Sequence, residues 1–353
     1  MTLAINSTSF SCIPMRMFAA EFVCGGGFSR RDLSDVPTPL RREGVAMLRA
    51  LAEDLSELGE VVVPLDSRIQ VKLPRNVIPV PINGSQPLWP QWVAAARDCE
   101  SAIIVAPEQG GTLAQAVSML RAGGLEPTMS SGDFLRVASD KWETARTFAV
   151  NRVPHPPTYV CSTLGEADRS AATRWVVKPR DGCGTERISV FDCFDKAAAA
   201  LTEGAILQGW SPGTPVSVGL IVVGGQMTLL PAVAQAIDSD SCSYAGGQGP
   251  LSDDLQRRVT SLASCALAAM PPTAKGFVGL DLILADQPSG DCVIEVNPRL
   301  TTSYVGLRHM VEGNLAARII GHGNGPLRCS AEVSSVRWAP DGQVWVNDSL
   351  VDE

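Results

Sequence analysis

The sequence predicts an α/β protein, α+β in part, with a parallel sheet first and a strand-rich region after it. Over the first third of the 353 residues, short apolar runs alternate with stretches of helical periodicity. From Val216 onward, strand patterns dominate. Hydrophobic residues make up 45% of the chain and charged residues 19%, a balance typical of globular domains and not of disordered segments.

Residues 15–128 are expected to form an α/β domain, and residues 1–14 a loose N-terminal tail. Strand patterns occur at residues 17–24, 61–63 and 101–106. Apolar residues at helical spacing predict helices over residues 39–58 and 112–121. Strands that alternate with helices in this way are typical of a parallel sheet covered on both faces.

The rest of the chain is expected to fall into three parts, residues 129–212, 213–325 and 326–353. In the first part, a helix over residues 141–150 precedes strands at 175–178 and 205–208. Strands dominate the second part, which also contains a helix over residues 253–269. The last part is expected to be a hairpin that turns at Pro340-Asp341-Gly342, followed by a tail.

Charge and composition exclude several classes of protein. The formal net charge is −8 and no Lys/Arg cluster occurs, which argues against a dedicated nucleic-acid binder. No apolar stretch approaches the roughly 20 residues that span a bilayer, and the first residues lack the pattern of a signal peptide. The ten cysteines form no C-x-x-C pair, which disfavours structural zinc. We therefore expect a cytoplasmic protein without membrane or nucleic-acid partners.

Two apolar strand patterns, at 279–284 and 292–297, flank a polar turn and are expected to pair as a hairpin. Asp281 near the start of one strand and Glu295 near the end of the other would then lie close together. Asn297 shares a strand face with Glu295. Such oxygen ligands suit Mg²⁺ or Mn²⁺, and Arg299 just beyond could neutralise a transferring phosphoryl group. Each residue alone is best explained as a polar strand end, but together they favour a metal site.

A second signal is a predicted strand that contains Lys178 and is followed by a Gly-rich loop over residues 181–186. The amides of such a loop could cover phosphates, although the loop matches neither a Walker A motif nor a complete G-x-G-x-x-G. Taken alone, a surface turn is the commoner meaning of this pattern. A third segment resembles a hinge between domains, with an apolar strand that runs into Gln208, Gly209, Trp210 and Ser211.

In this order, the segments resemble the ATP-grasp superfamily over roughly residues 130–321. The resemblance implies an ATP-grasp fold preceded by a Rossmann-like domain, with ATP and Mg²⁺ (or Mn²⁺) bound. It implies a metal site at Asp281, Glu295 and Asn297. The residues that it implies for ATP binding are Lys141, Lys178, Asp181, Gly182, Gly184, Thr185, Gln208, Gly209, Trp210 and Ser211. Two departures, Gln208 and Pro215 where glutamates are frequent, leave the adenine and ribose contacts open.

Within the superfamily, segments 20–27, 106–108 and 297–304 look most like the branch of tyramine–glutamate ligases of methanofuran-type cofactor synthesis. This implies an ADP-forming ligase that joins a small carboxylate to an amine through an acyl-phosphate. Lys178 and Arg299 would be catalytic, and Thr302, Ser303 and Glu108 would contact substrate. Glu108 could equally be a solvated loop residue. Homodimers are common in the superfamily, so a homodimer is compatible with this interpretation.

Two other interpretations stay open. One is a different ATP-grasp reaction, carboxylation or phosphotransfer, although the chain shows no biotin-carrier motif and no phosphohistidine domain. The other is a non-catalytic ATP-binding regulator. The presence of both lysines and all three metal ligands weighs against a regulator, because binding alone requires no metal-held γ-phosphate.

Overall fold

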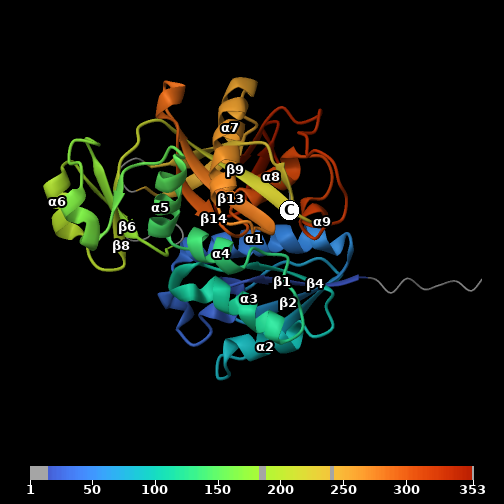
Figure 1. Cartoon of the computed structure of the whole chain (residues 1–353). Coiled ribbons are helices and arrows are strands. Elements are labelled where there is room, and N and C mark those ends of the chain that lie inside the picture. Colours follow the sequence, from blue (N-terminus) through green and yellow to red (C-terminus); the bar gives the residue numbers. More distant parts are fainter. Residues whose placement is uncertain (1–14, 183–187, 239–241, 352–353) are drawn as a thin grey trace, which may run out of the picture.

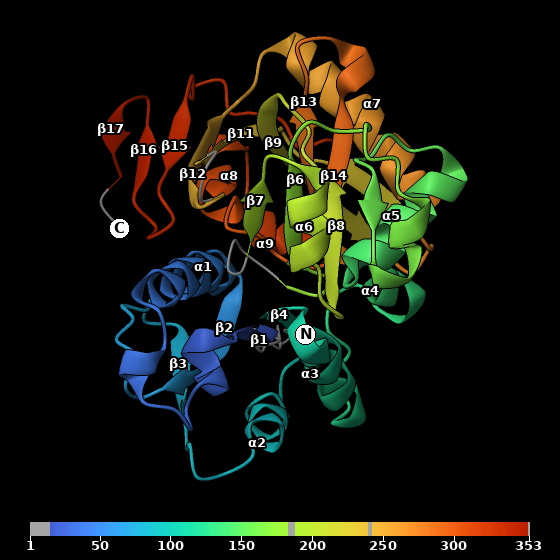
Figure 2. The same cartoon turned by 90° about the vertical axis from the view of Figure 1, so that its left-hand side faces the viewer.

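The computed structural model describes residues 15–182, 188–238 and 242–351 of the chain. Figure 1 shows the N-terminal domain below a larger, strand-rich body, and a small sheet under helix α6 to one side. Turned by 90°, the small sheet lies in front of the larger body and above the N-terminal domain (Figure 2). The expected N-terminal tail, residues 1–14, lies outside the described residues.

The N-terminal domain contains a parallel sheet, as the sequence predicts, and its strand order is β3-β2-β1-β4. Its strands are β1 (Met15–Glu21), β2 (Gly59–Asp66), β3 (Val77–Ile82) and β4 (Ser101–Val105), and its helices are α1 (Thr38–Ser56), α2 (Leu88–Ala95) and α3 (Thr112–Ala122). Met17 and Ala19 pack on the side of α1, whereas Phe18 packs on the side of α2 and α3. Both faces of the sheet are therefore buried.

Strand β3 has no counterpart in the sequence-based prediction, because Pro79 and Pro81 interrupt its pattern. It is an edge strand that pairs only with β2, and prolines are tolerated where their missing N–H groups face away from the sheet. Strand β1 ends earlier than predicted. The Glu21 carboxylate accepts hydrogen bonds from the amides of Val23 and Cys24 and so turns the chain.

The small sheet is antiparallel and has the order β5-β8-β6-β7. Its strands are β5 (Thr158–Tyr159), β6 (Trp175–Pro179), β7 (Ser189–Phe191) and β8 (Ala205–Gly209), with helices α4 (Gly132–Ala138), α5 (Lys141–Asn151) and α6 (Phe194–Ala200) in the same segment. Trp175 and Leu207 pack against Phe194 of α6. This core holds β6, the strand that carries Lys178, in a fixed position.

The larger body is built on an antiparallel sheet of order β14-β13-β9-β11-β12-β15-β16-β17, with β10 paired to β9. The strands are β9 (Thr214–Val223), β10 (Gln226–Leu229), β11 (Val233–Ile237), β12 (Tyr244–Gly249), β13 (Gly276–Leu284), β14 (Cys292–Asn297), β15 (Val336–Trp338), β16 (Val344–Val346) and β17 (Ser349–Leu350), and the helices are α7 (Asp253–Ala269), α8 (Tyr304–Met310) and α9 (Leu315–Ile319). Strands β15 to β17 thus extend the same sheet. Within the described ranges, no helix is both long and apolar enough to span a bilayer.

Helix α1 joins the two bodies, because it covers the first sheet and also packs on α8 and α9 (Figure 1). A buried polar network crosses this contact. Asp54 of α1 accepts hydrogen bonds from the Tyr304 hydroxyl and from Arg308 Nε, the latter at 2.8 Å. Arg308 also pairs with Glu53 at 3.0 Å. The network fixes α8, and therefore the preceding segment that carries Arg299, against the N-terminal domain.

We expect Asp54→Ala to lower the free energy of unfolding by about 2–4 kcal/mol, because it removes one partner of a buried ion pair. Chemical denaturation measures the change. Asp192→Ala is the matched control, since Asp192 is 90% exposed and lies 3.8 Å from Arg174. It should cost at most about 1 kcal/mol. Equal losses in the two variants would contradict this role of Asp54.

Candidate functional site

The centre of the site is set by the register of three antiparallel strands. Asp281 of β13 lies opposite Glu295 of β14 on one side and opposite Ser217 of β9 on the other. Strand β13 begins at Gly276, so Asp281 lies within the strand and not near its start as the sequence analysis expects. The two carboxylates are brought together by strand register, and the predicted hairpin forms.

Asp281 is surrounded by hydrogen-bond donors. Asn297 Nδ2 donates to Asp281 Oδ2 at 2.8 Å, and Gln235 Nε2 of β11 donates to Asp281 Oδ1 at 2.9 Å. Burial, followed by the nearby charge of Glu295, raises the pKa of Asp281, while hydrogen bonds from Asn297, Ser217 and Gln235 oppose the rise. The amides therefore hold this buried carboxylate in one orientation.

The first lysine, Lys141, is held at the start of helix α5. Asp140 caps this helix, because its side chain accepts hydrogen bonds from the amides of Trp142 and Glu143. Asp140 also forms an ion pair with Arg180, which follows strand β6, with Oδ2 and Nη2 2.5 Å apart. The Lys141 amide donates to the Arg180 carbonyl at 2.9 Å. Asp140 and Arg180, 40 positions apart in the sequence, therefore hold the start of α5 next to the end of β6.

Lys141 lies against the acidic pair. Its Nζ is 3.1 Å from Glu295 Oε1 and donates to the Gly182 carbonyl at 2.5 Å. Lys178 is buried on β6, and burial lowers its pKa from 10.5 to about 8. Glu295 and Asp281 act in the opposite direction, and the charge of Lys141 adds to the lowering. Two lysines and two carboxylates thus share one electrostatic environment.

Arg299, just beyond β14, reaches the N-terminal domain. Its Nε lies 2.9 Å from Glu108 Oε1, and its Nη1 donates to the Leu300 carbonyl at 3.0 Å. The Glu108 side chain is 6% exposed, and Glu108 Oε2 is buried without a hydrogen-bond partner among the described residues. Glu108 is thus not a solvated loop residue.

The hinge residues lie at the end of strand β8. The buried Gln208 donates from Nε2 to Thr158 Oγ1 at 3.0 Å, which orients its amide. Position 209 has no room for a side chain, because a Cβ atom there would lie 2.8 Å from the Pro157 ring. The Trp210 ring lies under the Arg174 guanidinium, 4.7 Å away, and Ser211 contacts the Cys292 thiol through its side chain. The contacts of Gln208, Trp210 and Ser211 thus fix this strand end against its neighbours.

The Gly-rich loop over residues 181–186 is only partly described. Asp181 Oδ2 accepts a hydrogen bond from the Gly110 amide at 2.9 Å, so the segment after β6 contacts the N-terminal loop that carries Glu108. Gly182 provides the carbonyl that binds Lys141. Gly184 and Thr185 lie outside the described residues.

Four further polar residues lie near the site: Thr302 and Ser303, which the sequence analysis names, and Glu43 and Tyr244, which it does not. Thr302 donates to Glu43 of helix α1, and Ser303 is buried and bonds to Thr301 at 2.7 Å. The pKa of Tyr244 is raised mainly by burial and further by the charges of Glu43 and Asp281. Glu43 and Tyr244 therefore extend the polar surface from the acidic pair toward α1. Only their proximity in the fold reveals them.

The donor set fits a hard divalent cation. Glu295 and Asp281 provide carboxylate oxygens, and Asn297, whose Nδ2 faces Asp281, keeps its Oδ1 for a ligand. In the described ranges, no group of three or more His, Cys, Asp or Glu side chains could hold a metal ion. Mg²⁺ needs few protein ligands where substrate phosphates complete its coordination.

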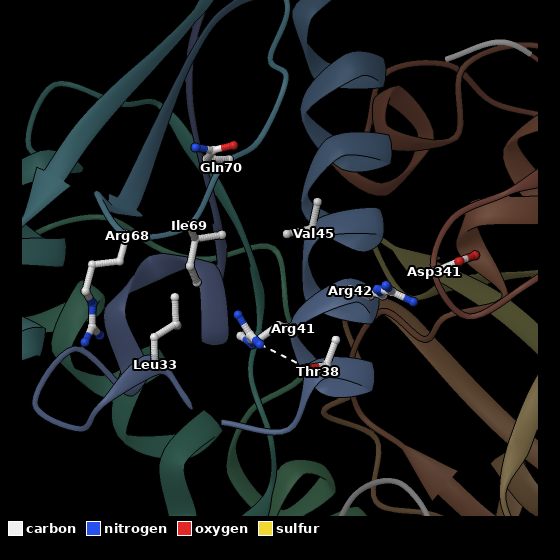
Figure 3. A pocket seen from close by; sticks show the side chains of 9 residues that line it. All are labelled: Leu33, Thr38, Arg41, Arg42, Val45, Arg68, Ile69, Gln70 and Asp341. Atoms are coloured by element: carbon white, nitrogen blue, oxygen red, sulfur yellow. Dashed lines mark hydrogen bonds between the residues drawn. The ribbon is translucent and has the colours of Figure 1, made fainter. Parts of the chain in front are cut away.

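A separate hollow of about 460 Å³ lies beside the first turns of α1 (Figure 3). Arg41, which bonds to Thr38, points toward Leu33 and Ile69, whereas Arg42 points to the other side of α1, toward Asp341 of the C-terminal turn. None of its lining residues belongs to the lysine–carboxylate cluster. The site is therefore defined by the chemistry of its side chains and not by this hollow.

Family models match two parts of the chain. The ATP-grasp domain matches residues 138–303, and the pre-ATP-grasp domain matches residues 59–126. Both tyramine–L-glutamate ligase relatives come from Methanocaldococcus. The one from M. fervens is 28% identical over 223 residues, 63% of this chain and 66% of the relative, and the one from M. jannaschii is 26% identical over 229 residues, 65% and 64% respectively. The match spans just under two thirds of either relative.

Solved structures share the architecture. An ATP-grasp superfamily protein from Archaeoglobus fulgidus has a TM-score of 0.67 at 23% identity, with 92% of both chains covered. An L-amino acid ligase from Bacillus licheniformis has a TM-score of 0.64 at 14% identity, with 92% of this chain and 79% of that one covered. The chain has the ATP-grasp fold, which confirms the predicted fold class. Within it, an ATP-grasp domain is preceded by a pre-ATP-grasp domain.

The lowered pKa of Lys178 predicts proton uptake on nucleotide binding. Between about pH 8 and 10.5 the free protein holds Lys178 largely neutral, and a bound phosphate favours the ammonium form. Affinity for Mg-ATP should therefore fall as the pH rises above about 8 and stay level just below it. Calorimetry at pH 9 in buffers of different ionisation enthalpy measures the uptake. Lys178→Arg should abolish it, because a guanidinium stays protonated. Equal uptake in both proteins would contradict the assignment.

Proposed function

We propose that this protein is an ATP- and Mg²⁺-dependent ligase that forms an amide bond from a small carboxylate and an amine through an acyl-phosphate. The observation that carries the proposal is the convergence of Lys141 and Lys178 on the Asp281–Glu295 pair, with Arg299 beyond it. Tyramine–L-glutamate ligases are similar over most of the chain, which supports this reaction class. Glutamate and tyramine are therefore the first substrates to test.

In this proposal, Lys141 and Lys178 bind the phosphates of ATP. The hinge from Gln208 to Ser211 contacts its adenine base. Asp281, Glu295 and Asn297 would hold Mg²⁺, which when bound would offset the negative charge of the phosphates. The substrate carboxylate attacks the γ-phosphorus, and ADP leaves. Positioning and charge neutralisation account for most catalysis of such transfers.

The second step joins the amine. Its nitrogen attacks the acyl carbon, the phosphate leaves with the electron pair of the acyl C–O bond, and the nitrogen loses a proton. Arg299 is positioned to stabilise the oxyanion that develops on the acyl oxygen. Thr302 and Ser303 are the proposed substrate contacts on the same segment.

The direct test is ADP release from Mg-ATP across a grid of carboxylic acids and amines that includes glutamate with tyramine. We expect ADP only when one acid and one amine are both present, with a product lighter than their sum by one water. ADP release that requires bicarbonate, or phosphate transfer without a joined product, would replace the ligase with another ATP-grasp reaction. Tight nucleotide binding without turnover in any pair would favour a regulator.

The assignment of the metal and oxyanion residues has its own test. Asp281→Asn and Arg299→Ala should each lower kcat by about 10²–10³-fold or more, because each removes charge that acts on the transition state. Asp286→Asn is the matched control, since Asp286 is an exposed residue in the turn between the same two strands. It should leave kcat unchanged. Circular dichroism checks that all three variants fold, and an unchanged kcat in Arg299→Ala would contradict its role.

A further inference from the structure

Glu108 occupies a position where parallel sheets commonly bind ligands. It follows strand β4, whose carboxyl end faces the ATP-grasp domain through the contact with Arg299. The same loop is held on its other side, where the Gly110 amide donates to Asp181. Gly110 and Gly111 have φ angles of 61° and 70°, so the turn needs glycine there. The loop is thus fixed between the two segments that follow Lys178 and Asn297.

The carboxylate of Glu108 is only half satisfied. Oε1 receives Arg299 Nε at 2.9 Å, whereas Oε2 is buried and has no partner among the described residues. A buried carboxylate oxygen without a hydrogen-bond donor is costly, so this atom calls for a donor from outside the described residues. The missing partner must be a donor, and beside a carboxylate a cationic donor is favoured most.

We propose that Glu108 Oε2 binds the primary ammonium group of a substrate, and that Glu108 thereby determines specificity. This inference rests on the proposed ligase function. Arg299 and Glu108 form an adjacent positive and negative pair, which matches a substrate that carries both a carboxylate and an ammonium group. An amino acid used as the acid is one source of the ammonium, and the amine substrate before it loses its proton is the other.

Glu108→Gln is the informative variant, because it retains an oxygen for Arg299 and replaces the unpartnered acceptor with an NH₂ group that repels ammonium. Each ligand is compared with its analogue in which hydrogen replaces the ammonium group, L-glutamate with glutarate and tyramine with 4-ethylphenol. The other primary amines of the grid are treated in the same way. Thermal shift and calorimetry measure binding with no need for turnover.

We expect wild-type protein to bind at least one ammonium ligand more tightly than its analogue, and Glu108→Gln to lose that preference by about 10- to 100-fold. A change confined to glutamate assigns the ammonium to the acid, and a change confined to tyramine assigns it to the amine. Glu126→Gln is the matched control, since Glu126 likewise pairs with an arginine, Arg121 of its own domain, but is 55% exposed. It should keep the wild-type preference.

Two results would overturn the inference. One is that no primary amine of the grid binds better than its analogue. The other is that Glu108→Gln weakens a ligand and its analogue equally, which would mean that Glu108 acts only through Arg299. The proposed function fails separately. If Glu108→Gln abolishes the preference for ammonium while no acid and amine pair releases ADP, the binding site stands and the ligase reaction does not.

Discussion

The pairing of β13 with both β9 and β14 is the constraint on which the site depends. Leu280 and Leu282 alternate with Asp281 and are fully buried in the core that helix α7 covers. Because side chains alternate between the two faces of a strand, a slip of one residue would move both leucines out of the core and Asp281 into it. The free energy of core burial therefore also keeps Asp281 opposite Glu295. Strand register here positions the proposed metal ligands without any dedicated structural element.

The lysines depend on a second constraint, the ion pair between Asp140 and Arg180. It connects the start of α5 to the end of β6, so that two lysines from different elements approach one acidic pair. Their charges do not simply add. The burial of Lys178, and to a smaller extent the charge of Lys141, favours the neutral form of Lys178, and the carboxylates favour its charged form. A phosphate ligand would shift this balance toward the ammonium, which makes nucleotide binding and protonation one coupled process.

Much of this arrangement could be predicted, because its parts are local in the sequence. The predicted hairpin needs only two apolar runs and a polar turn, and it is sufficient to bring Asp281 and Glu295 together. Gln235, Glu43 and Tyr244 were not predicted, since each comes from a distant element and lies in no motif. The early end of β1 depends on Glu21 bonding to backbone amides. No periodicity of apolar residues carries that information.

Glu108 shows a second limit of the sequence, which could not decide whether this residue is solvated or contacts substrate. Its burial decides against solvation, and the physics of buried ion pairs adds a further step. Two charges taken out of water seldom stabilise a protein more than apolar residues of similar size would. The pair of Glu108 and Arg299 is therefore weak evidence for stability at the interface between the domains. Its cost is better explained if a ligand completes it, with Arg299 directed to the acyl group and Glu108 Oε2 to an ammonium.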